Sequence, residues 1–106
     1  MIEYSDHFLK EVKQLSKKFK NIKSDLKLAV DEIENKNDLG VYLGYHIFKK
    51  RVPNSSIPTG KSGGFRIILY KQVKDKTVLL SIYSKTQKET LCDEELRMIL
   101  QVYMDH

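Results

Sequence analysis

The fold of this chain is decided by the stretch Lys61-Ser62-Gly63-Gly64-Phe65-Arg66-Ile67-Ile68-Leu69-Tyr70. Residues 65–70 are rich in β-branched and aromatic side chains, which favours a buried central strand. The glycines before them, with Pro53 and Pro58 further upstream, indicate that residues 53–64 form a loop. We therefore expect a loop that leads into the central strand of a sheet.

Two further strands are predicted on either side of this stretch. Residues 77–83 form an apolar, β-branched run, and residues 74–76 between the two runs predict a tight hairpin turn. Upstream, residues 45–52 read as a strand whose side chains alternate between two faces. One face is expected to carry Tyr45, Ile47, Lys49 and Arg51, and the other His46, Phe48, Lys50 and Val52.

Helices are predicted at both ends of the chain. Apolar residues at three- and four-residue spacing form one stripe over residues 8–19 and a second over residues 22–33, which together suggest an αα-hairpin. Residues 90–104 predict a final helix, and residues 1–4 a short first strand. The expected fold is α+β, in the order β-α-α-β-β-β-α, with an antiparallel sheet and a single domain over residues 1–106.

The composition excludes several classes of protein. Hydrophobic residues make up 41% of the chain, too many for a disordered protein. No apolar run approaches the roughly 20 residues of a membrane span. The first residues lack the pattern of a signal peptide, and the single cysteine, Cys92, forms no intramolecular disulfide. We expect a soluble cytoplasmic domain with no membrane partner.

The net charge of +5 conceals a strong asymmetry along the chain. Residues 49–88 hold ten basic residues and one acidic residue, Asp75, so this segment carries +9. Positive charge gathered on one surface attracts phosphates. The alternative is an ordinary solvated basic face, although ordinary surfaces mix both signs.

Two apparent motifs do not support a ligand. Gly60-Lys61-Ser62 looks like the end of a phosphate-binding loop, but Ser55 occupies the position of the required first glycine and a strand follows in place of a helix. His7, His46 and His106 show no metal-ligand spacing. We expect neither a metal nor a small-molecule cofactor.

Residues 61–70 resemble the glycine-arginine signature of the RelE/HigB toxins, within the RelE/ParE superfamily. The basic strand Phe48-Lys49-Lys50-Arg51-Val52 resembles the family's strand before the glycines. Residues 79–91 resemble its last strand and basic loop. The resemblance covers residues 45–100 well and residues 1–44 only by the type of element.

The resemblance implies a toxin of a type II toxin–antitoxin system. Such toxins cleave mRNA, mostly on the ribosome and without metal, by attack of the RNA 2′-hydroxyl on the adjacent phosphate. The implied partners are a cognate antitoxin, mRNA and the ribosome. Two alternatives stay open: a ParE-like toxin that inhibits DNA gyrase, and a non-catalytic RNA-binding module.

The resemblance also implies roles for individual residues. Arg66 is expected to stabilise the phosphate, Lys49 and Arg51 to bind phosphate or act as a base, and Lys85 to supply charge near the leaving group. The residues expected to bind RNA are Lys50, Lys61, Gly63, Gly64 and Lys88.

The chain departs from the family pattern at three positions, Thr86, Leu91 and Cys92. Several members have an arginine where this chain has Thr86, and some have a tyrosine near Leu91 or Cys92. The general acid is therefore unassigned, and Tyr70 and Tyr83 are interpreted as core residues.

Overall fold

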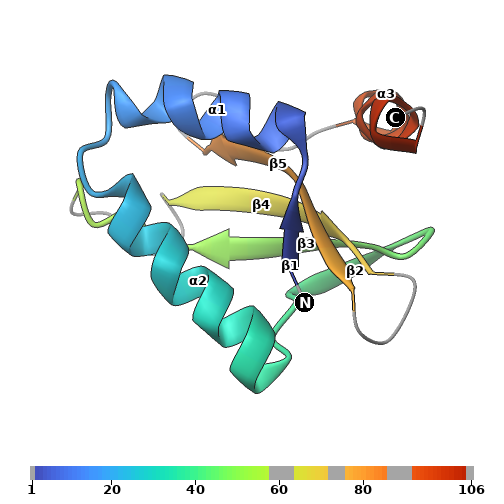
Figure 1. Cartoon of the computed structure of the whole chain (residues 1–106), viewed down its shortest axis with the longest axis horizontal. Coiled ribbons are helices and arrows are strands. Elements are labelled where there is room, and N and C mark those ends of the chain that lie inside the picture. Colours follow the sequence, from blue (N-terminus) through green and yellow to red (C-terminus); the bar gives the residue numbers. More distant parts are fainter. Residues whose placement is uncertain (1, 58–63, 72–75, 86–91, 105–106) are drawn as a thin grey trace.

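The computed structural model describes residues 2–57, 64–71, 76–85 and 92–104 (Figure 1). In chain order the elements are β1 (Ile2–Tyr4), α1 (Asp6–Ser16), α2 (Ile22–Lys36), β2 (Val41–Gly44), β3 (Ile47–Val52), β4 (Phe65–Tyr70), β5 (Thr77–Ser84) and α3 (Asp93–Met104).

The strands form one five-stranded sheet in the order β1-β5-β4-β3-β2. Neighbouring strands are antiparallel, except that β1 runs parallel to β5. The α+β class and the predicted order of helices are confirmed. The structure adds one strand, β2, which the sequence did not predict.

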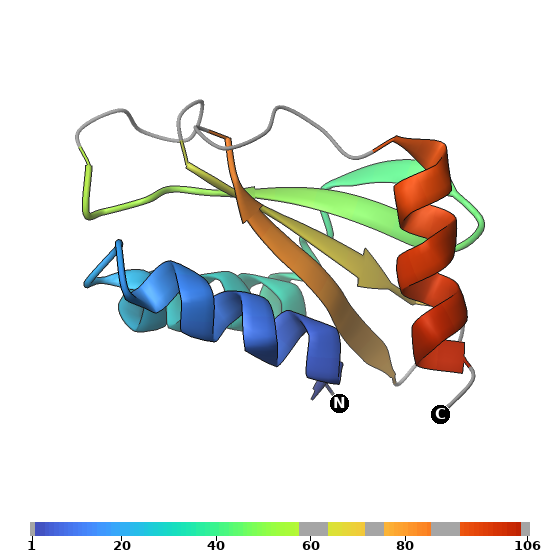
Figure 2. The same cartoon turned by 90° about the horizontal axis from the view of Figure 1, so that it is seen from above.

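The helices lie on both faces of the sheet (Figure 2). Helices α1 and α2 cover one face, and α3 packs against the other. On the first face, the rings of Phe19 and Phe65 meet edge to face with their centroids 5.4 Å apart, inside the larger core cluster. On the second face, Ile68, Leu80 and Tyr83 pack against apolar residues of α3. The sheet therefore separates two apolar layers, one on each face.

The start of α1 is tied directly to the sheet. The Ser5 hydroxyl caps the helix by accepting a hydrogen bond from the Phe8 N–H at 3.0 Å. The same hydroxyl donates to the Leu80 carbonyl at 3.1 Å. This N-cap marks the first turn of α1 and also joins it to β5. The start of the helix is therefore held in a fixed position over the sheet.

The turn from α2 into β2 relies on two unusual backbone conformations. Asn37 closes α2 in the left-handed conformation, with φ 50°. Gly40 follows with φ 85°, and a Cβ there would overlap the backbone of Lys49 in β3. Only glycine fits at this position, and it allows the chain to pass close to β3 before β2 begins.

The predicted strand boundaries are close to the observed ones. The strand predicted over residues 45–52 begins two residues later, at Ile47, because Tyr45 and His46 form the turn from β2. The two predicted helices at the start of the chain are confirmed, and the final helix begins at Asp93. Among the described residues, no helix has the length and apolar character needed to cross a membrane.

Candidate functional site

Three polar side chains form a row across the centre of the sheet. In the strand register, Arg51 of β3 is paired with Arg66 of β4, and Arg66 with Tyr83 of β5. Directly paired residues point to the same face and lie about 5 Å apart at their Cβ atoms. Tyr83 belongs to the apolar layer under α3, so the row Arg51–Arg66–Tyr83 lies on the α3 face.

Arg66 is the most enclosed cation of this row. It is 3% exposed, whereas Arg51 is exposed, and one of its guanidinium nitrogens, Nη1, donates to the Phe65 carbonyl at 3.2 Å. Burial lowers the pKa of the Arg66 guanidinium, and the positive charge of Arg51 lowers it further, while Tyr83 acts in the opposite direction. An arginine stays protonated at neutral pH nevertheless, so the row holds a buried positive charge.

Lys49 and Lys85 lie close to this row along their strands. Lys49 is two residues before Arg51, is paired with Ile68 on the same face, and is half-buried. Lys85 follows β5 directly, and its backbone N–H donates to the Gly64 carbonyl at 3.0 Å. The four residues expected to be catalytic therefore lie on, or directly after, three adjacent strands, and Arg51, Arg66 and Lys85 lie near one end of them.

Lys50 does not belong to this site. As the alternation of the strand predicted, Lys50 lies on the opposite face, with Phe48 and Val52, and there it is 3% exposed. Its ammonium forms ion pairs with Glu32 at 3.2 Å and Asp38 at 3.1 Å. Because two carboxylates and the helical layer enclose it, Lys50 joins α2 to β3 and offers no contact to RNA. The RNA-binding role expected for Lys50 is corrected accordingly.

Gly64 also has a structural reason to be glycine. The residue is buried, and a Cβ at this position would overlap the Val52 carbonyl of β3. Close packing between the ends of β3 and β4 therefore requires glycine here. The expectation that Gly64 also allows RNA to approach the backbone stays a prediction. Lys61, Gly63 and Lys88 lie outside the described residues.

Tyr83 is the residue of the row that sequence reasoning missed. Its position in an apolar strand favoured a core role, and it is indeed 5% exposed. The missing information was the pairing of strands, because only the register brings its ring beside Arg66. Tyr70, the other tyrosine considered, lies at the far end of β4, with its ring centroid 6.1 Å from that of His46.

A carboxylate on the opposite face fixes the shape of β5. The register of β4 and β5 shifts between Ile68 and Leu69, the mark of a β-bulge. At this point Glu11 of α1 accepts hydrogen bonds from the Ser81 hydroxyl at 2.7 Å and from the Ile82 N–H at 3.1 Å. The buried polar groups of the bulge thus have a partner, and the strand beyond it turns Tyr83 towards α3.

The donor chemistry of the described residues does not form a metal centre. Within residues 2–57, 64–71, 76–85 and 92–104, no group of three or more histidine, cysteine, aspartate or glutamate side chains could hold a metal ion. Cys92 is exposed, just before α3. The polar groups of the row are guanidinium and phenol, which suit the binding of an anion.

Comparison with known proteins connects this geometry to a family. The model of the RelE toxin of the RelE/RelB toxin–antitoxin system matches residues 7–104, which include α1 from its second residue, the whole of α2 and α3, and every residue of the row. No curated protein matches the chain.

Proposed function

The chain belongs to the RelE toxin family, and we propose that it acts as a metal-independent endoribonuclease that cleaves messenger RNA and thereby inhibits translation. As a RelE toxin it has a cognate antitoxin as its partner. The observation that supports the proposed activity is the row Arg51–Arg66–Tyr83, which places a buried cation and a phenol side by side on one face of the sheet.

The proposed reaction needs three groups. A base takes the proton of the RNA 2′-hydroxyl while that oxygen forms a bond to the adjacent phosphorus. The bond from phosphorus to the 5′-oxygen then breaks, and an acid gives that oxygen a proton. The products are a 2′,3′-cyclic phosphate and a 5′-hydroxyl. Cations stabilise the negative charge that builds up on the phosphate oxygens between these two events.

We assign the stabilising charge to Arg66. A guanidinium binds two phosphate oxygens at once, and in a buried site of low dielectric its attraction to a phosphate is stronger than in water. The neighbouring charge of Arg51 adds to the attraction. Because Arg66 is 3% exposed, the phosphate has to enter between the row and its surroundings, so water is displaced as the substrate binds.

Lys49 and Tyr83 are the candidates for proton transfer. Lys49 lies on the same face as the row, and we assign to it the role of base. Tyr83, beside Arg66, is our candidate for the acid that the sequence left unassigned. Lys85 supplies further charge near the leaving oxygen.

The proposed substrate is mRNA on the ribosome, in the cytoplasm. Support comes from the basic segment at residues 49–88, of which Lys49, Arg51 and Arg66 lie on the α3 face. Binding that depends on such charges weakens as salt rises. The chain is therefore expected to engage RNA through its backbone phosphates, with the position of the cut set by the ribosome.

Cleavage of an mRNA in a reconstituted translation system, mapped by primer extension, tests this proposal. We expect cuts within the translated region, with 5′-hydroxyl ends. Arg66→Ala should reduce the rate by at least about tenfold, whereas Lys10→Ala, an exposed lysine on α1, should leave it unchanged.

Two variants of Lys49 separate its possible roles in the same assay. If Lys49 is the base, Lys49→Arg loses as much activity as Lys49→Ala, because a guanidinium keeps its proton. Retained activity in Lys49→Arg would restrict Lys49 to binding phosphate. Absence of cleavage with and without ribosomes, together with inhibition of DNA supercoiling by gyrase, would replace the ribonuclease with a ParE-like toxin.

A further inference from the structure

Strand β2 leaves an uncharged apolar edge at one side of the sheet. It is the last strand in the sheet order, and residues 39–46 contain no Asp, Glu, Lys or Arg. Val41 is 62% exposed and Tyr42 58%. Edge strands are usually protected by charged residues or proline, because an open edge pairs readily with another chain. An unprotected edge of this kind indicates a strand partner.

The turn beside this edge holds a tyrosine out towards solvent. Tyr45 and His46 connect β2 to β3 with φ of 53° and 64°, as a two-residue type I′ turn requires. Such turns favour Asn-Gly, and backbone strain of this kind tends to occur at functional sites. The Tyr42 hydroxyl accepts a hydrogen bond from the His46 N–H at 3.4 Å. The turn leaves Tyr45 78% exposed.

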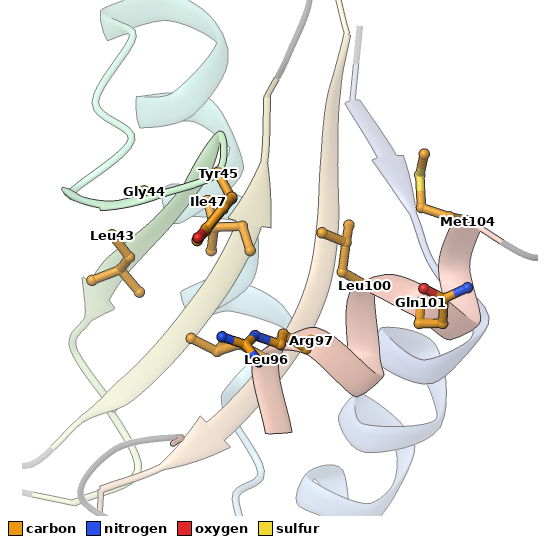
Figure 3. Close-up of a pocket in the computed structure, with 9 residues that line it drawn as sticks. All are labelled: Leu43, Gly44, Tyr45, Ile47, Leu96, Arg97, Leu100, Gln101 and Met104. Carbon is orange, nitrogen blue, oxygen red and sulfur yellow. The ribbon is translucent and has the colours of Figure 1, made fainter. Parts of the chain in front are cut away.

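An apolar groove of about 510 Å³ separates this turn from α3. Figure 3 shows Leu43, Tyr45 and Ile47 on one side of it and Leu96, Arg97 and Leu100 of α3 on the other. Among the described residues that line the groove, Arg97 alone is charged. The groove meets the open strand at Leu43 and Gly44, so the side chains of an added strand that lie beside this end of β2 would be at its mouth.

We propose that the antitoxin docks at this edge and groove, which rests on the toxin role proposed above. An extended, acidic segment of the antitoxin adds to β2 as a further strand, as in other cases of strand addition. Its alternate apolar side chains enter the groove beside Leu43 and Ile47, and a carboxylate pairs with Arg97.

Charge favours an acidic partner over a second copy of this chain. Val41 is the cross-strand neighbour of Lys49, and Arg51 follows on the same face. With Arg97 across the groove, the surroundings are basic, and the whole chain carries +5. A second copy would bring like charges together, whereas acidic residues gain on both sides. Docking here also places carboxylates one strand away from Lys49, the proposed base.

Two synthetic peptides of eight residues provide the test, one alternating valine with glutamate and the other valine with lysine. Each is titrated into the full chain without RNA, and backbone amide shifts are followed by NMR. We expect the acidic peptide to bind, with shifts concentrated in β2 and the groove. Arg97→Glu should weaken it by about tenfold and reverse the preference between the peptides.

Matched substitutions test the groove itself. Leu43→Asp should abolish binding of the acidic peptide, whereas Leu28→Asp, at a leucine that is 68% exposed on α2, should leave it unchanged. No binding, equal binding of both peptides, or shifts confined to the row Arg51–Arg66–Tyr83 would overturn the proposal. So would a dimer of the free chain, seen by sedimentation and lost in Leu43→Asp. None of these outcomes depends on RNA cleavage, so the proposed function is judged separately.

Discussion

Arg66 combines burial with positive charge, and the two oppose each other. Its guanidinium is removed from water and lies beside Arg51, and both conditions lower its pKa. The unfolded chain therefore holds this proton more tightly than the folded one. It follows that the charged form of Arg66 lowers the stability of the fold at every pH below its folded pKa. Such a cost is typical of a residue kept for function.

Replacing Arg66 with methionine is expected to stabilise the protein. Methionine keeps an unbranched apolar stem and removes the buried charge, so Arg66→Met should raise the free energy of unfolding by about 1 kcal/mol. A urea titration of the two proteins measures this difference. A loss of stability in Arg66→Met would show that the contacts of the guanidinium outweigh its desolvation.

Residue roles were predictable where alternation alone decides them. The sequence placed Lys49 and Arg51 on one face and Lys50 on the other, and the structure agrees. It did not show that Glu32 of α2 and Asp38, in the turn after α2, meet Lys50. That contact depends on how a helix packs against the sheet, so Lys50 looked like one more member of a basic cluster.

Strand β5 shows how one helix controls the geometry of the sheet. Leu80 and Tyr83 are three residues apart yet both face α3, which a regular strand does not permit. The bulge adds one residue to β5, which brings both side chains to the same face. Glu11 accepts hydrogen bonds from the Ser81 hydroxyl and the Ile82 N–H on the other face. Without this support, the end of β5 would present different residues to Arg66.

Glu11→Ala is expected to lower the free energy of unfolding by about 1–3 kcal/mol, because it leaves the buried Ile82 N–H and Ser81 hydroxyl without their acceptor. Hydrogen exchange of the Ile82 amide should also become faster. Glu11→Gln retains an acceptor oxygen and should lose less. If Glu11→Ala behaved like Lys10→Ala in both measurements, the bulge would be stable without the carboxylate.

The missed strand β2 has a physical explanation in its turn. Residues 41–44 contain strand-forming side chains, but Tyr45 and His46 lack the Asn-Gly signal of a two-residue hairpin, and they adopt positive φ all the same. The parallel pairing of β1 with β5 was equally hidden, since it joins segments that lie far apart in the sequence. Local pattern identifies strands more readily than their partners.

Over the whole molecule, the basic residues of the segment 49–88 fall into two groups with different surroundings. Lys49, Arg51 and Arg66 gather on the α3 face. Other members contact distant parts of the fold instead: the ammonium of Lys71 donates to the Asn37 side chain at 3.1 Å, and Lys76 pairs with Glu3 of β1 at 3.4 Å. A count of charges along the sequence could not separate these groups, because their partners come from distant elements.

The same separation organises the two faces of the sheet. The α1 and α2 face is a closed core, and it holds the structural ion pairs of Lys50. The α3 face carries the proposed catalytic row at one end and the apolar groove at the other. RNA and antitoxin are thus proposed to meet the same face from different sides.

The most direct test of the ribonuclease proposal is the rate of translation-dependent mRNA cleavage by Arg66→Met. This variant is expected to be at least as stable as the natural protein, and once the urea titration has shown this, a loss of activity is assigned to the missing charge. The account predicts a rate at least about tenfold lower, with Lys10→Ala unchanged. Cleavage by Arg66→Met at the natural rate would contradict it, because the proposed site would then lack its central charge and still function.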